Sequence, residues 1–252
     1  MIQNTFQILE RVSERREKSI WKQGIRTWDD FLGTACVKGI PKEKKPYFDR
    51  QLEKAKKHLH LHDSSYFTNL LPSVQAWRLY GNFRQDAVFL DIETEGVCQH
   101  ADIVVFGLYD GIRTKTMIRG INFDPHALKQ ELQKYSLIIT FNGSSFDLPF
   151  IRRRYDFLPG IPHIDIRHCC ARLGMAGGLK EIELLFGVKR SDLVRRIANG
   201  DPLLLWRMYR ASGDTHYLHL LIEYNEEDTI NLKKITDYCY ARLSADLLKS
   251  LT

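Results

Sequence analysis

The sequence predicts an α/β fold in which a mixed sheet is flanked by helices and preceded by a small helical region. Two observations support this expectation. The first 62 residues carry apolar side chains at near-helical spacing among many charges, as amphipathic helices do. From residue 87 onward three strand-like segments follow one another, and helical and strand-like segments then alternate before a long helical end. We expect a helical, basic region over residues 1–62 and an α/β domain over residues 63–252.

The N-terminal region is predicted to contain three helices. The first lies in "TFQILERVSERREKSIWKQGI", where Gly24 can end the helix. Thr27 is the expected N-cap of a second helix in "TWDDFL". The third lies in "KKPYFDRQLEKAKKHLHLH", which is rich in lysine. We therefore expect a basic helical surface in this part of the chain.

The second region is predicted to begin with three strands, at residues 87–93, 102–109 and 113–118. A helix follows in "DPHALKQELQKY", with Asp124 as N-cap and Pro125 at the first helical position. The segment "SLIITF" then predicts a buried strand, and helical patterns run from residue 145 to the end. Together these segments predict a mixed sheet.

The charge of the chain is unevenly distributed. Residues 1–86 contain 16 Lys and Arg against 10 Asp and Glu, whereas residues 87–252 contain 21 of each. The net charge of +6 therefore belongs to the N-terminal third. Such an excess suits a polyanionic partner, and the alternative is an ordinary solvated basic surface.

Several protein classes do not fit the sequence. No run of about 18 apolar residues is present, so we expect no membrane span. The N-terminus lacks the basic start and apolar core of a signal peptide. The five cysteines are odd in number and show no C-x-x-C spacing, which argues against a disulfide framework or a structural zinc site. We expect a reducing, cytoplasmic environment.

Two acids interrupt the strand-like segment "AVFLDIETEG". Alternate residues of a strand share a face, so Asp91 and Glu93 point the same way. At about 4 Å and an effective dielectric of about 20, two such charges repel by about 4 kcal/mol. A fold tolerates this when one acid stays protonated or a cation lies between the two.

Two further motifs carry acids. In "LIITFNGSSFDLPF", Asp147 is expected in the first turn of a helix, just past a buried strand. Alone, an acid there is more simply explained by the helix dipole. In "LLIEYNEEDTINLKKI", Tyr224 and Asp228 are four residues apart and share one helix face. Alone, this pair is a weak signal.

In this order the three motifs are far more specific. "FLDIET", "FNGSSFDLPF" and "YNEED" resemble the exonuclease motifs of the DEDD superfamily, Tyr-bearing branch, as in the proofreading domains of family B DNA polymerases. The segments "HIDIRHCCARLG" and "GLKEIELLFGV" look closer to a stand-alone, RNase H-like group, over residues 63–244. The N-terminal "SIWKQGIRTWDDFL" resembles the helical lead-in of that group, which is similar to helix-hairpin-helix modules.

The resemblance implies a ribonuclease H-like fold and a metal-dependent 3′→5′ exonuclease. It assigns four carboxylates to two Mg²⁺ or Mn²⁺ ions, and Tyr224 to the attacking water. The implied metal ligands are Asp91, Glu93, Asp147 and Asp228. The expected partner is DNA or RNA with a single-stranded or frayed 3′ end. Two alternatives remain open: a nucleic-acid-binding module that has lost turnover, and a structure-specific endonuclease.

A few other residues are secondary candidates. We expect Asn142 and Arg154 to contact substrate, although Arg154 and its two arginine neighbours also suit ordinary salt bridges. Asp165 is expected as a helix N-cap rather than as support for the site. Glu95 replaces the small polar residue usual after D-x-E-T and is expected in a turn.

Overall fold

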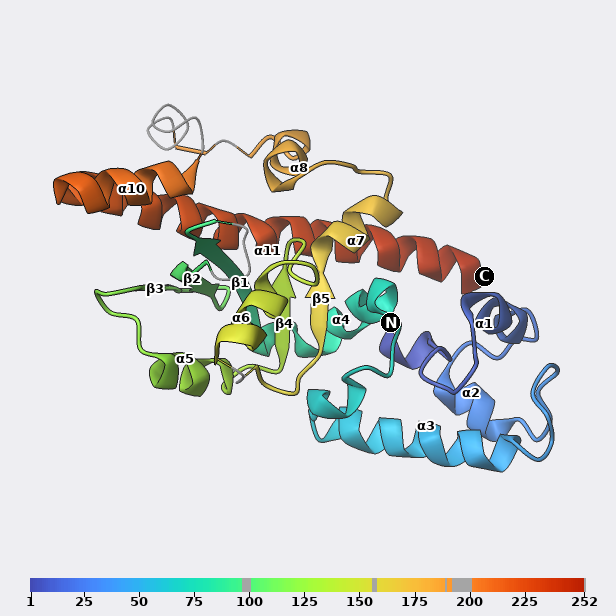
Figure 1. The fold of residues 1–252 in the computed structure, drawn as a ribbon. Coiled ribbons are helices and arrows are strands. Elements are labelled where there is room, and N and C mark those ends of the chain that lie inside the picture. The colour runs from blue at the N-terminus through green and yellow to red at the C-terminus, as the bar shows by residue number, and fades with distance from the viewer. Residues whose placement is uncertain (97–100, 156–157, 189, 192–200, 252) are drawn as a thin grey trace.

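A computed structural model describes residues 1–96, 101–155, 158–188, 190–191 and 201–251. Its centre is a five-stranded sheet with the strand order β3-β2-β1-β4-β5 (Figure 1). The strands are β1 (Ala87–Thr94), β2 (Ile103–Tyr109), β3 (Thr114–Ile118), β4 (Leu137–Thr140) and β5 (His163–Asp165). β1 pairs antiparallel with β2 and parallel with β4, so the predicted mixed sheet is confirmed.

Four of the five strands lie where the alternating and apolar patterns predicted them. The fifth, β5, has only three residues and was not predicted, because so short a segment shows no periodicity. The helix after β3 begins at Pro125, and the Asp124 side chain accepts a hydrogen bond from the His126 N–H, as predicted. The helix that follows β4 begins at Asp147, slightly later than expected.

The rest of the described chain consists of helices, short 3₁₀ segments and the loops between them. The α-helices are α1 (Glu14–Trp21), α2 (Trp28–Gly33), α3 (Lys45–His60), α4 (Tyr80–Phe83), α5 (Pro125–Leu132), α6 (Asp147–Tyr155), α7 (Ile166–Arg172), α8 (Leu179–Leu185), α10 (Pro202–Ser212) and α11 (Thr215–Leu251). The 3₁₀ segments are Ile2–Asn4, Ser64–Phe67, Ser73–Leu79 and Arg84–Asp86. Within the described ranges, no helix is long and apolar enough to cross a membrane.

The two faces of the sheet are covered by different helices. On one face Val88, Leu90 and Ile92 of β1 pack with residues of α5 and α6. The opposite face of β1 lies against α11, which contacts β1 to β4. Strand alternation therefore directs Phe89, Asp91 and Glu93 toward α11. The apolar face of β1 is therefore buried under α5 and α6, and the face that carries the two acids lies toward the long C-terminal helix α11.

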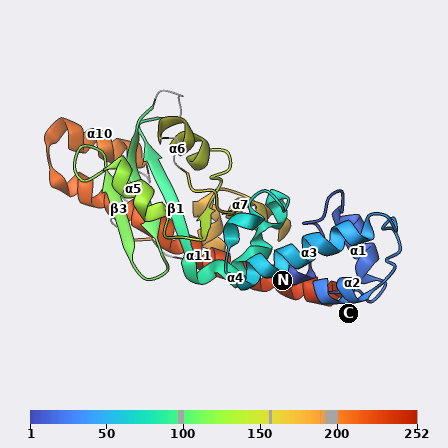
Figure 2. The same ribbon diagram turned by 90° about the horizontal axis from the view of Figure 1, so that it is seen from below.

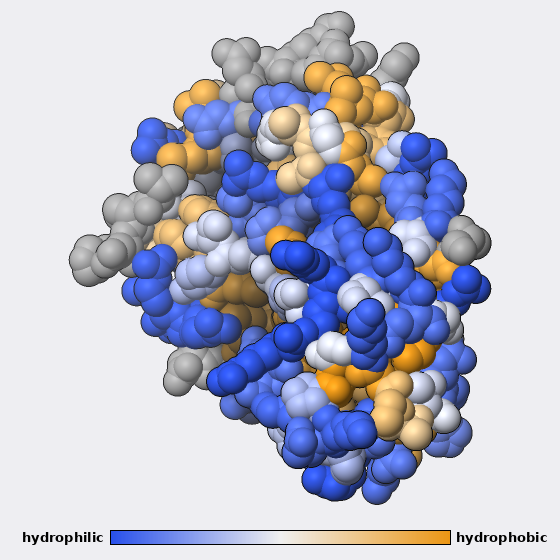
Figure 3. All heavy atoms as spheres, turned by 90° about the vertical axis from the view of Figure 1, so that its right-hand side faces the viewer, coloured by the Kyte–Doolittle hydropathy of each residue, from blue (hydrophilic) through white to orange (hydrophobic). Residues whose placement is uncertain are grey.

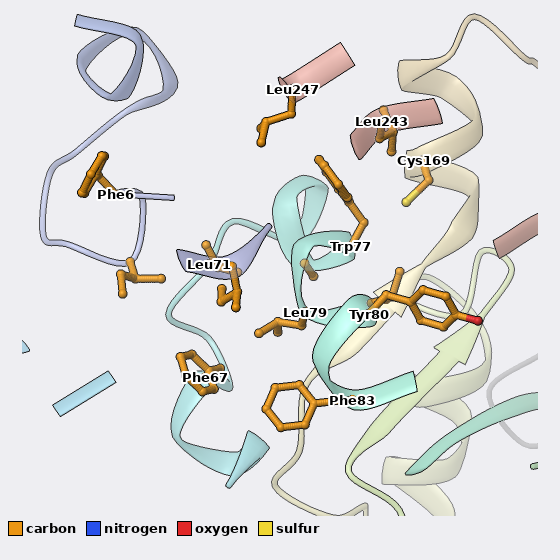
Figure 4. Packing of buried hydrophobic residues seen from close by; sticks show 14 of the residues in the cluster. Phe6, Phe67, Leu71, Trp77, Leu79, Tyr80, Phe83, Cys169, Leu243 and Leu247 are labelled. Atoms are coloured by element: carbon orange, nitrogen blue, oxygen red, sulfur yellow. The ribbon is translucent and has the colours of Figure 1, made fainter. Parts of the chain in front are cut away.

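Helix α11 links the sheet to the N-terminal helices. It runs along the length of the molecule, from α10 beside the sheet to α1 and α2 at the other end (Figures 1 and 2). Its last turns place Leu243 and Leu247 in a buried cluster that also contains Phe6, Trp77 and Cys169 (Figure 4). One buried cluster thus contains residues from both sides of the predicted boundary between residues 62 and 63.

A buried ion pair joins helix α1 to the 3₁₀ segment Ser73–Leu79. Arg78 donates to both carboxylate oxygens of Glu17, at 3.1 and 2.9 Å, and both side chains are fully buried. The same carboxylate accepts hydrogen bonds from Thr5 Oγ1 at 2.6 Å, Phe6 N at 2.8 Å and Gln7 Nε2 at 2.7 Å. The buried Glu17 carboxylate therefore has a counter-charge and three further hydrogen-bond donors, which offset the cost of its desolvation.

The end of the molecule that carries the N-terminal helices is mainly hydrophilic, with smaller apolar areas (Figure 3). Several lysines of this region are paired with acids: Lys45 lies 2.6 Å from Asp49, and Lys56 contacts Asp29. The predicted third helix is confirmed as α3, and Lys54 and Lys57 on it are exposed.

Candidate functional site

The acidic end of β1 lies where the sheet opens. β1 pairs with β4 only over Ala87–Phe89, so Asp91 and Glu93 lie beyond the last residue that faces β4. On its other edge β1 stays paired with β2, where Asp91 is opposite Gly107 and Glu93 is opposite Val105. The edge of β1 that pairs with β2 thus holds the two acids in place. The edge that faces β4 is unpaired at these residues.

The Asp91 carboxylate is held by a residue of α11. Asn225 Nδ2 donates to Asp91 Oδ2 at 2.8 Å, and the Asn225 side chain is fully buried. Asn225 packs over Gly107, where a Cβ would lie 1.9 Å from Asn225 Oδ1. Any side chain at position 107 would therefore displace the amide that orients Asp91.

Helix α11 also supplies the third acid and the tyrosine. Asp228 lies one turn after Tyr224, so both face β1. One carboxylate oxygen from each of Asp91, Glu93 and Asp228 lies within 4.8 Å of the others. The Tyr224 side chain is largely buried beside this group.

The fourth predicted acid approaches from the other side of β1. Asp147 is the first residue of α6 and is only 3% exposed. Its Oδ1 accepts a hydrogen bond from the Ile92 N–H at 3.1 Å, a group that β4 does not reach because its pairing with β1 stops at Phe89. Asp147 thus lies next to the backbone between Asp91 and Glu93. From there its negative charge raises the pKa of both carboxyl groups.

Burial and mutual repulsion disfavour the charged form of these acids. Burial raises the pKa of Asp91 well above its usual range, and the charge of Glu93 raises it further. Burial and the charge of Asp228 do the same to the pKa of Glu93. Burial raises the pKa of Asp147 and of Asp228 to about 7, although the Arg190 guanidinium opposes the rise at Asp228. Ionisation of all four acids together is therefore unfavourable unless further positive charge lies near them.

Two basic side chains border the cluster. Arg190 donates from Nη2 to Asp228 Oδ1, and its guanidinium carbon lies 5.0 Å from the centre of the Tyr224 ring. Lys180 Nζ, from the first turn of α8, lies 5.0 Å from the same ring. Both cations therefore lie over the tyrosine.

The secondary candidates are engaged elsewhere. Asn142, at φ 63°, accepts from Arg167 Nη1 at 2.7 Å, and Arg154 pairs with Asp102. Their predicted contacts with substrate stay predictions. Asp165 is the N-cap of α7, as expected, and its carboxylate also accepts from the Asn142 and Ser144 N–H groups. Glu95 accepts from Trp206 Nε1 at 3.1 Å rather than joining the acids.

Sequence reasoning missed several residues around the site. Asn225 lies inside the "YNEED" motif, and its position next to Tyr224 was the available signal. Gly107 interrupts an otherwise apolar strand, which is the usual sign of a close approach. Arg190 and Glu183 gave no signal, because Arg190 meets Glu183, seven residues before it, and Asp228, 38 residues after it, only in the folded chain.

The donor set suits a hard divalent cation. Asp91, Glu93 and Asp228 offer only carboxylate oxygens, which are the ligands that Mg²⁺ and Mn²⁺ prefer. A cation among them would also offset the repulsion that raises their pKa values. The residues present therefore fit the metal that the sequence implies.

Two comparisons with known proteins gave a match, one to a family model and one to a solved structure. A family model described as the RNase_H superfamily matches residues 88–240, a range that contains all four acids and the tyrosine. Among solved structures, the family B DNA polymerase from the hyperthermophilic archaeon Pyrobaculum calidifontis is similar, at 14% sequence identity and a TM-score of 0.48. That match covers 60% of this chain and 24% of the polymerase chain. No curated protein matches the chain.

Proposed function

This chain belongs to the RNase H superfamily, and from that premise we propose that it is a metal-dependent 3′→5′ exonuclease. Its substrate is DNA or RNA with a single-stranded or frayed 3′ end. The observation that carries the proposal is the meeting of Asp91, Glu93 and Asp228 within 4.8 Å, with Asp147 beside them. This arrangement is costly without a cation, and all its ligands are oxygen donors.

The roles of the acids follow from their positions. Asp91, Glu93 and Asp228 would hold divalent cations, and Asp147 would complete the set from α6. Divalent cations held by these carboxylates would supply charge stabilisation to the attacking and leaving oxygens of a phosphodiester. Asn225 keeps the Asp91 carboxylate turned toward the cluster.

Tyr224 has a different role because it is not a good ligand at neutral pH. Burial and the charge of Asp228 raise the pKa of its hydroxyl, so it stays protonated. A neutral phenol can donate or accept a hydrogen bond and thereby orient the attacking water. We therefore assign Tyr224 to positioning of the water.

The N-terminal region would add electrostatic affinity for the nucleic acid. The whole excess of positive charge lies before residue 87, and Lys42, Lys54 and Lys57 are exposed. Replacing these three by Gln should weaken oligonucleotide binding and flatten its salt dependence. An unchanged salt slope would show that this charge is only a solvated surface.

The deciding experiment uses purified protein with Mg²⁺ or Mn²⁺ and 5′-labelled single-stranded and duplex DNA and RNA. We expect a ladder of products shortened one nucleotide at a time from the 3′ end, and loss of that ladder in Asp228→Ala. A second set of substrates carries a blocked 3′ end, which an endonuclease would still cut. Binding without any metal-dependent cleavage would favour the binding module instead.

A further inference from the structure

Arg190 is anchored by a buried acid outside the carboxylate cluster. Its Nε donates to Glu183 Oε2 at 2.7 Å, and its Nη2 donates to Glu183 Oε1 at 3.0 Å. Glu183, from α8, also accepts from Asn231 Nδ2 at 3.0 Å and is 2% exposed. Glu183 therefore fixes one edge of the guanidinium plane from behind.

The other edge of the same guanidinium faces the cluster. Nη2 uses its second N–H for Asp228 Oδ1, and a planar guanidinium places an N–H of Nη1 parallel to that bond. Nη1 is buried and finds no hydrogen-bond acceptor among the described residues. The Arg190 side chain is only 9% exposed. A buried, charged donor without an acceptor is costly, which indicates a site for a ligand.

The surroundings of this edge define the ligand. Asp228 lies on one side of it, and the Tyr224 ring lies 5.0 Å from the guanidinium carbon. These are the residues assigned to the metal and to the attacking water. A ligand that meets the free N–H there needs an oxygen acceptor, and a planar guanidinium is well suited to phosphate oxygens.

We propose that Arg190 binds a non-bridging oxygen of the phosphodiester that is cleaved, through the edge that carries Nη1. The inference rests on the proposed nuclease function and adds a substrate-binding residue to it. Glu183 acts as the positioning residue, because it holds the guanidinium at the correct angle. The positive charge of Arg190 also lowers the repulsion between the acids and the approaching phosphate.

Oligonucleotide binding provides the first test. A 5′-fluorescein-labelled single-stranded oligonucleotide is titrated in Ca²⁺, which replaces Mg²⁺ in order to limit turnover, and its anisotropy is measured. We expect Arg190→Gln to raise Kd about 10- to 100-fold, the range for a lost charged hydrogen bond. Arg190→Lys keeps the charge but loses the planar edge, so its Kd should rise less. Arg242→Gln, at an exposed position of α11, is the matched control and should match the wild type.

Metal binding separates this role from a purely structural one. Mn²⁺ titration by calorimetry should show equal or tighter binding in Arg190→Gln, because a competing cation has been removed from Asp228. If thermal stability, Mn²⁺ affinity and oligonucleotide affinity all fell together in Arg190→Gln, the role of Arg190 would be only to hold α8 against α11. That result would overturn the proposal.

A sulfur substitution tests the contact itself. Each phosphorothioate diastereomer at the 3′-terminal linkage replaces one non-bridging oxygen. One diastereomer should slow the wild type and have a smaller additional effect in Arg190→Gln, because contacting groups are not additive. If the wild type is active and the effect of each diastereomer simply adds to that of Arg190→Gln, the assignment of Arg190 is overturned and the proposed nuclease function is not affected. A wild type that neither binds nor cleaves nucleic acid would overturn the proposed function as well.

Discussion

Asn225 occupies the space that a side chain at Gly107 would need. A Cβ at position 107 would lie 1.9 Å from Asn225 Oδ1 and 2.7 Å from its Cγ. From this place Asn225 Nδ2 reaches Asp91 Oδ2 at 2.8 Å. A bare backbone in β2 therefore allows a residue of α11 to set the direction of a carboxylate in β1, across the face of the sheet.

Gly107→Ala tests this relationship. The added methyl must push Asn225 away, so Asp91 loses its donor and α11 shifts from the sheet. We expect metal affinity to fall about tenfold or more and stability to fall by about 1–3 kcal/mol, as for overpacking of a core. Calorimetric Mn²⁺ titration and urea unfolding measure the two effects.

Gly33→Ala is the control, because a Cβ there meets nothing within 4 Å. It should leave both quantities close to wild type. If Gly107→Ala bound metal as the wild type does, the contact between Asn225 and Asp91 would not orient a ligand.

Removing one charge from the cluster should stabilise the metal-free protein. Burial and the charge of Glu93 disfavour the ionised form of Asp91 and so raise its pKa. Asp91→Asn removes that charge at nearly constant volume. In EDTA we expect a melting temperature equal to or above that of the wild type, together with loss of nuclease activity.

The exposed Asp246 of α11 provides the comparison for that variant. Asp246→Asn should change neither melting temperature nor activity. Full nuclease activity in Asp91→Asn would contradict the assignment of the site.

The pH dependence of metal-free stability should reflect the same acids. The folded pKa of Asp147 and of Asp228 is about 7, above the usual carboxyl value of 3.8. A raised folded pKa adds stability that is complete below pH 4 and disappears as pH rises through 7. A tenfold difference in proton affinity between the folded and unfolded states corresponds to about 1.4 kcal/mol. Between pH 6 and 8 the melting temperature in EDTA should therefore fall by at least about 3 °C.

Saturating Mg²⁺ should reduce this fall, because the metal favours the ionised acids. Asp228→Asn removes one titrating group and should flatten the slope in EDTA. A wild-type melting temperature that is constant from pH 6 to 8 would show that these carboxyl groups are not perturbed.

The sequence predicted the fold where local patterns carry it, and missed what depends on distant contacts. The alternation in β1 placed Asp91 and Glu93 on one face, and Asp124 was recognised as a cap from its neighbours alone. Arg190 was not recognised, because its role depends on Asp228, which lies 38 residues away. The buried ion pair of Glu17 was not predicted for the same reason, because its partner Arg78 follows 61 residues later.

That distant pair predicts how the N-terminal helices are attached. Arg78→Met would leave the buried Glu17 carboxylate without its counter-charge, although Thr5 and two other donors remain. Breaking a buried pair by removing one partner costs about 3–5 kcal/mol. We expect a loss of that size in urea unfolding.

The exposed pair of Lys18 with Glu14 is the matched control, at 2.9 Å on the same helix as Glu17. Lys18→Met should cost less than about 1 kcal/mol. Equal losses in both variants would mean that the buried pair does not hold the N-terminal region to the rest of the chain.

Tyr224→Phe tests the assignment of the attacking water. The variant keeps the ring that Lys180 and Arg190 lie over and removes only the hydroxyl. Metal and oligonucleotide affinity should therefore stay close to wild type, and the loss should fall on the chemical step. Positioned acid–base groups contribute about 10²–10⁴-fold, and a tyrosine that only orients water should lie at or below the lower limit. Single-turnover cleavage measures this step directly.

Two comparisons make the result for Tyr224 decisive. Asp228→Ala removes a proposed ligand from the same face of α11 and should lose far more activity, together with metal affinity. Because the hydroxyl pKa is raised by burial, the tyrosine stays neutral across the working range, and the pH profile of Tyr224→Phe should keep the wild-type shape. A wild-type cleavage rate in Tyr224→Phe, with Asp228→Ala inactive, would remove the tyrosine from the mechanism and leave the role of the carboxylates intact.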